Sequence, residues 1–418
     1  MRRVVVTGMG IWSCIGQDLQ TVTESLKQGR SGVIYDPKRI EYGLQSGLTG
    51  YVPRPDMKLL LLRKFRATMS EDAEYAYMAA RQAFEQAGIT DEYLRAKEVG
   101  IIFGNDGNVH MLDSFTIMKE ERNSQMVGPN ALFQGETSSV TMNLSTIFHL
   151  KGMNLCVGAA CASSSHAIGI ATTFIRQGMQ DVILAGGSCG IDMRGAAATD
   201  ALEAISRRND SPAEASRPFD VDRDGMTPSG GAAALILEDY DHAVARGATI
   251  LAEIAGYGFS SNGIEDISMP NADAEYIAMQ RALADAGMQP SDVDYVNAHG
   301  TSTFLGDIEE AKALTRLFVQ QSEITNPKSQ ITNNKPYISS TKSMTGHENW
   351  MAGASEVVYS ILMMQNGFVA PNINLENKID EAKELNIVTE TVCTPVHTVL
   401  SNSSGMGGTN SALVIKSI

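Results

Sequence analysis

The sequence predicts an α/β protein built from two related halves, and three observations support that prediction. Short runs rich in Val and Ile alternate with longer amphipathic runs along the 418 residues, which favours helices layered on mostly parallel strands. The helical segment at 72–88 recurs at 273–287 with two residues deleted. In both halves a strand follows, and further on a second strand runs through a bend of small residues into a long helix. We therefore expect a duplicated α/β unit.

In the first half, β-branched runs bounded by turn residues mark the strands. They lie at residues 3–8, 98–104, 153–159, 181–187 and 232–238. The helix predicted over 70–88 opens with a capping-box pattern at Thr68–Glu71 and stops at Gly88.

In the second half, the helix at 273–287 precedes the strand in "VDYVNAHGTS", as the helix at 72–88 precedes "EVGIIFGNDG". The bend in "MNLCVGAACASSSHAIGIATTFI" is matched by the bend in "PYISSTKSMTGHENWMAGASEVVYSIL". We place the boundary near residues 248–254, which gives an N-terminal half 1–250 and a C-terminal half 251–418. Duplication would bring Cys161 and His347 close to a pseudo-twofold axis.

Composition excludes several classes of protein. A formal charge of −15 argues against a nucleic-acid partner, but an acidic protein could still dock on a local basic patch. The sequence has no run of 18 apolar residues and no signal peptide, so we expect no membrane span. Five cysteines without a CxxC pair indicate no metal site, free thiols and a cytoplasmic location.

Cys161 is the first candidate for chemistry, because it lies at a predicted strand-to-helix bend. The N-terminus of a helix stabilises an anion, so we expect the pKa of this thiol to be lowered. The neighbours Ala159, Ala160, Ala162 and Ser163 are small and leave the backbone open to a substrate. The bend resembles a nucleophile elbow. The alternative is an ordinary buried cysteine, which is the more common case.

Two histidines complete a nucleophile-and-base constellation. His299 follows a predicted strand in "YVNAHGTST", and His347 follows another in "SSTKSMTGHENW", together with Lys342. Glu356 lies nine residues past His347, about two and a half helical turns away.

Two motifs point to functions that we reject. "VVVTGMGIWSCIG" is similar to a dinucleotide fingerprint, but Ser13 stands at the third glycine. "DVDRDG" at 220–225 matches half of a calcium loop, but Gly231 replaces the glutamate that the loop needs. We expect its carboxylates to pair with Arg217 and Arg223.

Over nearly its whole length the sequence resembles the β-ketoacyl–acyl carrier protein synthases, condensing enzymes of the thiolase fold. The motifs are "VVVTGMG", "ACASSSHAIG", "SRPFDVDRDG", "NAHGTST", "STKSMTGH" and "GMGGTN", in that order. The resemblance implies a five-layer αβαβα fold, a homodimer or a heterodimer with a related subunit, and an acyltransferase that needs no metal or cofactor. Its substrates would be carried on the phosphopantetheine of acyl carrier protein.

The resemblance also implies the roles of individual residues. Cys161 would take the acyl chain as a thioester, and malonyl–acyl carrier protein would lose carbon dioxide and attack it, giving 3-oxoacyl–acyl carrier protein. His299 and His347 would stabilise the enolate, with Lys342 and Glu356 fixing the electrostatics. Further implied groups are the oxyanion-hole N–H groups of Cys161 and Met406, the pantetheine channel residues Thr301 and Thr303, and the carrier-docking residues Arg63, Lys64, Arg66 and Arg208.

Departures from the family pattern concern the acyl pocket. Met406 stands where the family has a phenylalanine, and Gly107 falls where relatives carry a bulky aliphatic residue. Both changes predict a wider channel, unless a dimer partner's side chain near Phe133 fills it. A chain-length factor without catalysis is disfavoured by Cys161, and a degradative thiolase by "SSGMGG" in place of a second cysteine. Fatty-acid elongation and a polyene or polyketide pathway both stay open.

Overall fold

The central sheet has ten strands, and its two halves use the same strand order. The computed structural model describes residues 1–107, 109–320 and 335–418. The sheet order is β10-β9-β13-β14-β8-β1-β7-β6-β4-β5. In the N-terminal half the strands are β1 (Val4–Ser13), β4 (Gly100–Gly104), β5 (Asn154–Val157), β6 (Val182–Cys189) and β7 (Gly231–Asp239). In the C-terminal half they are β8 (Ala252–Ser261), β9 (Tyr295–Asn297), β10 (Tyr337–Ser339), β13 (Thr398–Gly405) and β14 (Thr409–Lys416).

Counted from the first strand of each half, both halves read 3-2-4-5-1, which confirms the predicted duplication. The halves meet where β1 pairs with β8 over two residue pairs, Val5 with Glu253 and Val6 with Ala252. The five strands expected in the first half all form, within a few residues of the predicted bounds.

The expectation of mostly parallel strands is wrong, because the sheet is mixed. In each half the outer pairs are parallel, whereas the pairs that involve the last and the first strand are antiparallel. The reason lies in the connections. A tight turn at 406–408 joins β13 to β14, and an excursion over 190–230, which includes α10 (Met193–Ala201), joins β6 to β7. Both connections begin and end at the same end of the sheet instead of crossing over to the other, so the strands they join are antiparallel.

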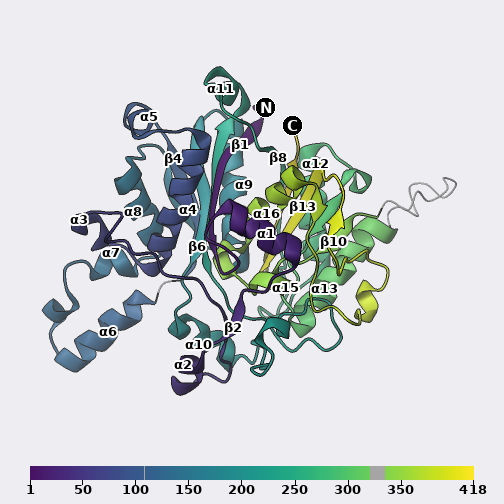
Figure 1. The fold of residues 1–418 in the computed structure, drawn as a ribbon, viewed down its shortest axis with the longest axis horizontal. Helices are drawn as coiled ribbons and strands as arrows, with labels where there is room; N and C mark the ends of the chain where they lie inside the picture. The colour runs from purple at the N-terminus through teal and green to yellow at the C-terminus, as the bar shows by residue number, and fades with distance from the viewer. Residues whose placement is uncertain (108, 321–334) are drawn as a thin grey trace.

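Helices lie on both outer faces of the fold and between its two halves (Figure 1). Helix α4 (Glu71–Ala87) packs on β1 and β7, and α12 (Ala272–Ala286) packs on β8 and β14. Between the halves, α9 (Ser163–Arg176) and α16 (Ala352–Asn366) contact each other and strands of both sides. These contacts give the layering expected of the thiolase fold.

Paired glycines explain the motif that is similar to a dinucleotide fingerprint. Gly8 and Gly10 of β1 lie against backbone carbonyls of α4, where any Cβ atom would collide with the helix. Gly256 and Gly258 of β8 lie in the same way against carbonyls of α12. The glycines therefore allow close packing of helix on sheet in both halves.

Helix α4 is capped by Ser70, whose side chain accepts a hydrogen bond from the N–H of Ala73, and not by Thr68 as predicted. Gly88 ends the helix in the left-handed conformation.

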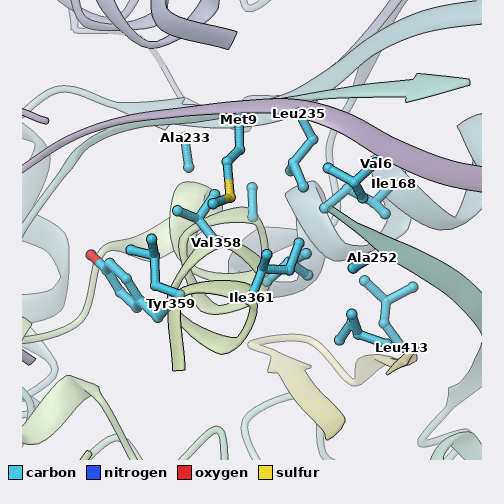
Figure 2. Close-up of a cluster of buried hydrophobic side chains, with 14 of the residues drawn as sticks. Val6, Met9, Ile168, Ala233, Leu235, Ala252, Val358, Tyr359, Ile361 and Leu413 are labelled. Carbon is cyan, nitrogen blue, oxygen red and sulfur yellow. The ribbon is translucent and has the colours of Figure 1, made fainter. Parts of the chain in front are cut away.

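The two central helices are held by a continuous apolar core (Figure 2). Val358 and Ile361 of α16 are fully buried beside Met9 of β1 and Leu413 of β14. Because each such side chain stabilises the fold by about 1.5–3 kcal/mol when buried, the N-termini of α9 and α16 are fixed relative to each other. Those two N-termini carry the candidate site.

Candidate active site

Cys161 lies at the predicted bend between β5 and α9. It occupies the short turn η2 (Ala160–Ala162), and Ala160 before it has a φ of +46°, a left-handed conformation that is costly for alanine. Two side chains hold this strained turn. Asp106 Oδ2 accepts a hydrogen bond of 2.6 Å from the N–H of Ala160, and Ser163 Oγ accepts from Ala159 and donates to the carbonyl of Ala160. The bend is thus a nucleophile elbow in geometry.

The predicted lowering of the thiol pKa is wrong in direction. Burial raises the pKa of the Cys161 thiol, and this effect outweighs the backbone N–H groups of Met406 and Cys161 and the positive charge of Lys342, which lower it. Removing water from around the sulfur disfavours the thiolate more than the helix end favours it. The free thiol is therefore the resting form.

His347 faces the sulfur directly. Its Nε2 atom lies 3.0 Å from Cys161 Sγ, and its Nδ1 accepts a hydrogen bond from the N–H of Asn349. Because Nδ1 is an acceptor, the neutral ring carries its hydrogen on Nε2, where it can donate to the sulfur or to a substrate oxygen. Burial, with the charge of Lys342 second, holds the pKa of His347 well below its usual range.

His299 lies beside His347, and the two ring centroids are 5.4 Å apart in an edge-to-face arrangement. The loop that carries it is fixed by Glu310, whose carboxylate accepts from the N–H groups of His299 and Gly300. Burial first, then Lys342 and His347, holds the pKa of His299 well below its usual range. Its Nδ1 is buried without a partner among the described residues. Both rings are therefore neutral hydrogen-bond donors near one sulfur.

Lys342 and Glu356 form a buried ion pair, each with a side chain that is 1% exposed. Lys342 Nζ donates to Glu356 Oε1. Burial raises the pKa of Glu356 to about 8, although Lys342 opposes that shift. Burial is the larger cause of the neutrality of both imidazoles, and the positive charge of Lys342, which also lies near Cys161, adds to it.

The remaining predicted residues of the site are one proposed oxyanion donor, two threonines and a glycine. Met406 directs its N–H at the Cys161 sulfur, while its side chain is 54% exposed. Thr301 and Thr303 share a hydrogen bond of 2.9 Å between their hydroxyls, on the loop after His299. Gly107 does not open free space by itself, because the indole of Trp350 lies against it.

The basic residues are on two separate segments. Arg63, Lys64 and Arg66 lie on α3 (Arg63–Arg66), at the side of the N-terminal half in Figure 1. Arg208 is in another segment, where it pairs with Asp224 at 3.5 Å and donates to the carbonyl of Asp222. Phe133 is 44% exposed and lines a cleft of about 550 Å³ together with Lys64 and Phe65.

The pairing expected around "DVDRDG" is confirmed for one arginine and wrong for the other. Asp220 pairs with Arg217 at 3.1 Å, whereas the side chain of Arg223 pairs with Asp307 at 3.5 Å. Asp307 also accepts from the N–H of Thr301. The motif therefore braces the loop that carries the predicted pantetheine channel.

Sequence reasoning missed Asp106, Glu310 and Trp350. Asp106 could have been found from the duplication, because "GNDG" after β4 matches "NAHG" after β9 and so pairs Asp106 with His299. Glu310 lies in α13 (Phe304–Thr315), and only the fold brings it under the His299 loop. No signal in the sequence pairs Trp350 with Gly107.

Comparisons with known proteins agree with this geometry. Models of the β-ketoacyl synthase N-terminal and C-terminal domains match residues 1–243 and 251–376. The chain is 39% identical to 3-oxoacyl-[acyl-carrier-protein] synthase 1 of Haemophilus influenzae, over 100% of this chain and 99% of that protein. The chain belongs to the β-ketoacyl synthase family. The predicted family and condensing acyltransferase activity are thereby confirmed.

Solved structures give the same result for the fold of this β-ketoacyl synthase. A β-ketoacyl synthase from Burkholderia phymatum superposes with a TM-score of 0.92 at 35% identity, over 100% of both chains. A type II polyketide ketosynthase, solved bound to a hexaketide and in complex with its acyl-carrier protein, gives a TM-score of 0.87 at 28% identity, over 100% of this chain and 99% of that one. Among the described residues of this β-ketoacyl synthase, none of the helices has the length and apolar content to cross a bilayer.

Proposed function

We propose that Cys161 of this 3-oxoacyl–acyl carrier protein synthase accepts the growing chain and that His299 and His347 generate the enolate that extends it. The enzyme condenses an acyl thioester with malonyl–acyl carrier protein to 3-oxoacyl–acyl carrier protein in fatty-acid elongation. The observation that carries the assignment is the sulfur of Cys161, 3.0 Å from His347 Nε2 and faced by the N–H of Met406.

In the first half-reaction the sulfur attacks the acyl thioester and the carrier thiol leaves. The thiol gives up its proton as the new carbon–sulfur bond forms, and that proton ends on the departing carrier sulfur. The N–H groups of Cys161 and Met406 are the proposed donors to the oxyanion, since a fixed backbone donor needs no reorganisation when charge develops. Lys342 favours the transient negative charge on sulfur.

In the second half-reaction malonyl–acyl carrier protein binds at the acylated enzyme. The carbon–carbon bond to the carboxylate breaks, carbon dioxide leaves, and the electron pair becomes the enolate. The donors are the N–H groups of the two neutral imidazoles, aimed at the thioester oxygen that gains charge. The enolate carbon then attacks the acyl carbonyl and expels the Cys161 thiolate, which takes up a proton again.

Mutation of the nucleophile tests this assignment. Cys161→Ala should abolish acyl transfer while leaving the fold intact, because the sulfur is the proposed covalent acceptor. Intact-protein mass after incubation with acyl–acyl carrier protein measures the adduct. Cys156→Ala is the matched control, since Cys156 is on β5 in the same half and should leave acylation unchanged. Normal condensation by Cys161→Ala would overturn the assignment.

We also propose that two copies of this chain assemble through the outer edge of β5. This strand ends the sheet, and Leu155 on it is 40% exposed. In the same half of the chain, α6 (His110–Glu121) buries none of its described residues and exposes Met111, Leu112 and Phe115 by more than half. An unpaired edge strand favours pairing with a second chain, and exposed apolar side chains favour burial against one. Leu155→Lys should shift the mass measured by light scattering from that of a dimer to that of a monomer. If the chain instead pairs with a related subunit, the unsubstituted chain by itself should already be monomeric.

The N-terminal half 1–250 and the C-terminal half 251–418 remain our proposed domains. The proposed docking surface for acyl carrier protein is α3, where Arg63 and Lys64 are exposed. The cytoplasmic location stays a prediction, supported by five free cysteines.

A further inference from the structure

Trp350 follows His347 by three residues but takes no part in the steps above. It belongs to the turn η6 (Asn349–Met351), between His347 and α16, and this turn packs against η2, which holds Cys161. On another side the turn packs against β6. The turn that carries Trp350 therefore borders the segment whose sulfur would hold the acyl group.

The ring of Trp350 occupies the space that Gly107 leaves open. A Cβ atom at position 107 would lie 2.8 Å from Cη2 and 3.0 Å from Cζ2 of the indole, closer than a side chain tolerates. Gly107 directly follows Asp106, whose carboxylate holds the N–H of Ala160 next to the nucleophile. The ring and the elbow of Cys161 therefore contact the same short loop.

The indole N–H of Trp350 is a buried donor without an acceptor in the part of the chain that the structure describes. Its Nε1 atom is buried and has no hydrogen-bond partner among the described residues, while the ring packs against the apolar core. The other tryptophan of the chain, Trp12, donates from Nε1 to the carbonyl of Pro53 at 2.8 Å. Buried donors are rarely left unpaired, so the Trp350 N–H points to an acceptor that arrives with the substrate.

We propose that Trp350 determines which acyl chain Cys161 accepts. The ring limits the space beside Gly107, and the indole N–H donates a hydrogen bond to an oxygen atom on the chain. The substrate class is an acyl thioester that carries a keto or hydroxyl group, in preference to a saturated chain of equal length. This inference rests on the proposed role of Cys161 as the acyl acceptor.

Acylation rates separate the two properties of the side chain. The substrates are octanoyl–acyl carrier protein and eight-carbon chains with one keto group at carbon 5 or carbon 7, and the readout is intact-protein mass. The parent should acylate at least one keto chain about fivefold faster than octanoyl, the effect of one ordinary hydrogen bond. Trp350→Phe keeps a ring without the N–H and should lose that preference while retaining the octanoyl rate. Trp350→Ala should admit bulkier chains, and Trp12→Phe should behave like the parent.

Fluorescence gives a second, direct readout. In Trp12→Phe the only tryptophan is Trp350, so its emission should change when Cys161 is acylated by a keto chain, and less so with octanoyl. Equal rates for keto and saturated chains in the parent, with the same ratio in Trp350→Phe, would overturn the inference and leave Trp350 a packing residue whose N–H meets water. If no chain acylates Cys161 in the parent, the proposed nucleophile fails instead, which is a distinguishable result.

Discussion

The two halves share one strand order, yet the bends before their central helices are built differently. In the N-terminal half, residues 158–162 join β5 to α9 and surround Cys161 with small side chains. In the C-terminal half, residues 340–351 join β10 to α16 and include the extra helical turn α15 (Lys342–Thr345). The two helix N-termini interlock, because the N–H of Ala354 donates to Ser164 Oγ at 2.9 Å and Gly353 lies against Ser165.

The difference shows how a duplicated scaffold divides the chemistry. The short bend supplies the nucleophile, the backbone N–H of Cys161 and an open approach to the sulfur, with strain at Ala160. The longer bend buries Lys342 and holds His347, so it sets the charge of the site. Three predictions test this division, in order of expected effect.

The largest effect is expected from breaking the ion pair under the longer bend. Lys342→Met removes the charge that lowers the pKa of Glu356, so the buried carboxyl takes up a proton and stays without its partner. We expect a loss of about 3 kcal/mol in the free energy of unfolding, the lower end of the cost of breaking a buried ion pair. Combining Lys342→Met with Glu356→Gln should recover most of that loss in denaturant titrations. The matched control is Lys383→Met, because Lys383 pairs with Asp380 at 2.7 Å on the surface and its loss should leave stability unchanged. Equal losses from both lysines would contradict the account.

A smaller effect is expected at Glu348, which joins the longer bend to β1. It is 1% exposed and accepts hydrogen bonds from Ser13, Ser355 and Tyr359. Burial raises its pKa to about 7, above the value of about 4.3 in an unfolded chain. Its contribution to stability is therefore complete below about pH 4.3 and is lost as the pH rises through 7.

Glu348→Gln should remove that dependence. The free energy of unfolding of the parent, relative to the variant, should fall by up to about 1.4 kcal/mol per pH unit between pH 5 and 7. Denaturant titrations across this range measure it. A difference between the two proteins that does not vary with pH would show that Glu348 keeps one protonation state.

The smallest effect is expected on the outer surface of the N-terminal half. Reversing Arg63 and Lys64 to Glu should raise the KM for carrier-bound substrates severalfold and weaken its salt dependence, with kcat unchanged. Reversing Arg208, which already pairs with Asp224, should change KM less. Unchanged KM in the double variant would leave α3 an ordinary charged face.

Much of this architecture could be predicted from sequence, because its signals are local. The strands, helix α4 and the duplication follow from periodicity and repeated order, and Cys161, His299 and His347 each lie in the connection that follows a strand. The mixed sheet was missed because strand direction depends on which segments pair. The direction of the Cys161 pKa was also missed, since helix ends are visible in sequence whereas the burial that outweighs them is not.

The residues around the acyl pocket could not be predicted from local sequence patterns. The glycine at position 107 was one of two residues that predicted a wider channel. The space beside it is filled by Trp350, which is remote in sequence. The interpretation of one glycine therefore depended on a contact between the two halves. Glu310 was missed although it lies only eleven residues after His299, because the direction of its side chain depends on how α13 packs under the loop.

One measurement tests the division of labour most directly: the His299→Ala variant, assayed for two steps on the same sample. Intact-protein mass follows acylation of Cys161, and release of carbon dioxide from malonyl–acyl carrier protein follows decarboxylation. This division predicts acylation near the parental rate, because neither the nucleophile nor its proposed backbone donors, the N–H groups of Cys161 and Met406, belong to the His299 loop. It predicts decarboxylation slowed by about 10²-fold or more, because one donor to the developing oxyanion is gone. Decarboxylation near the parental rate, or loss of both steps together in a folded protein, would contradict it.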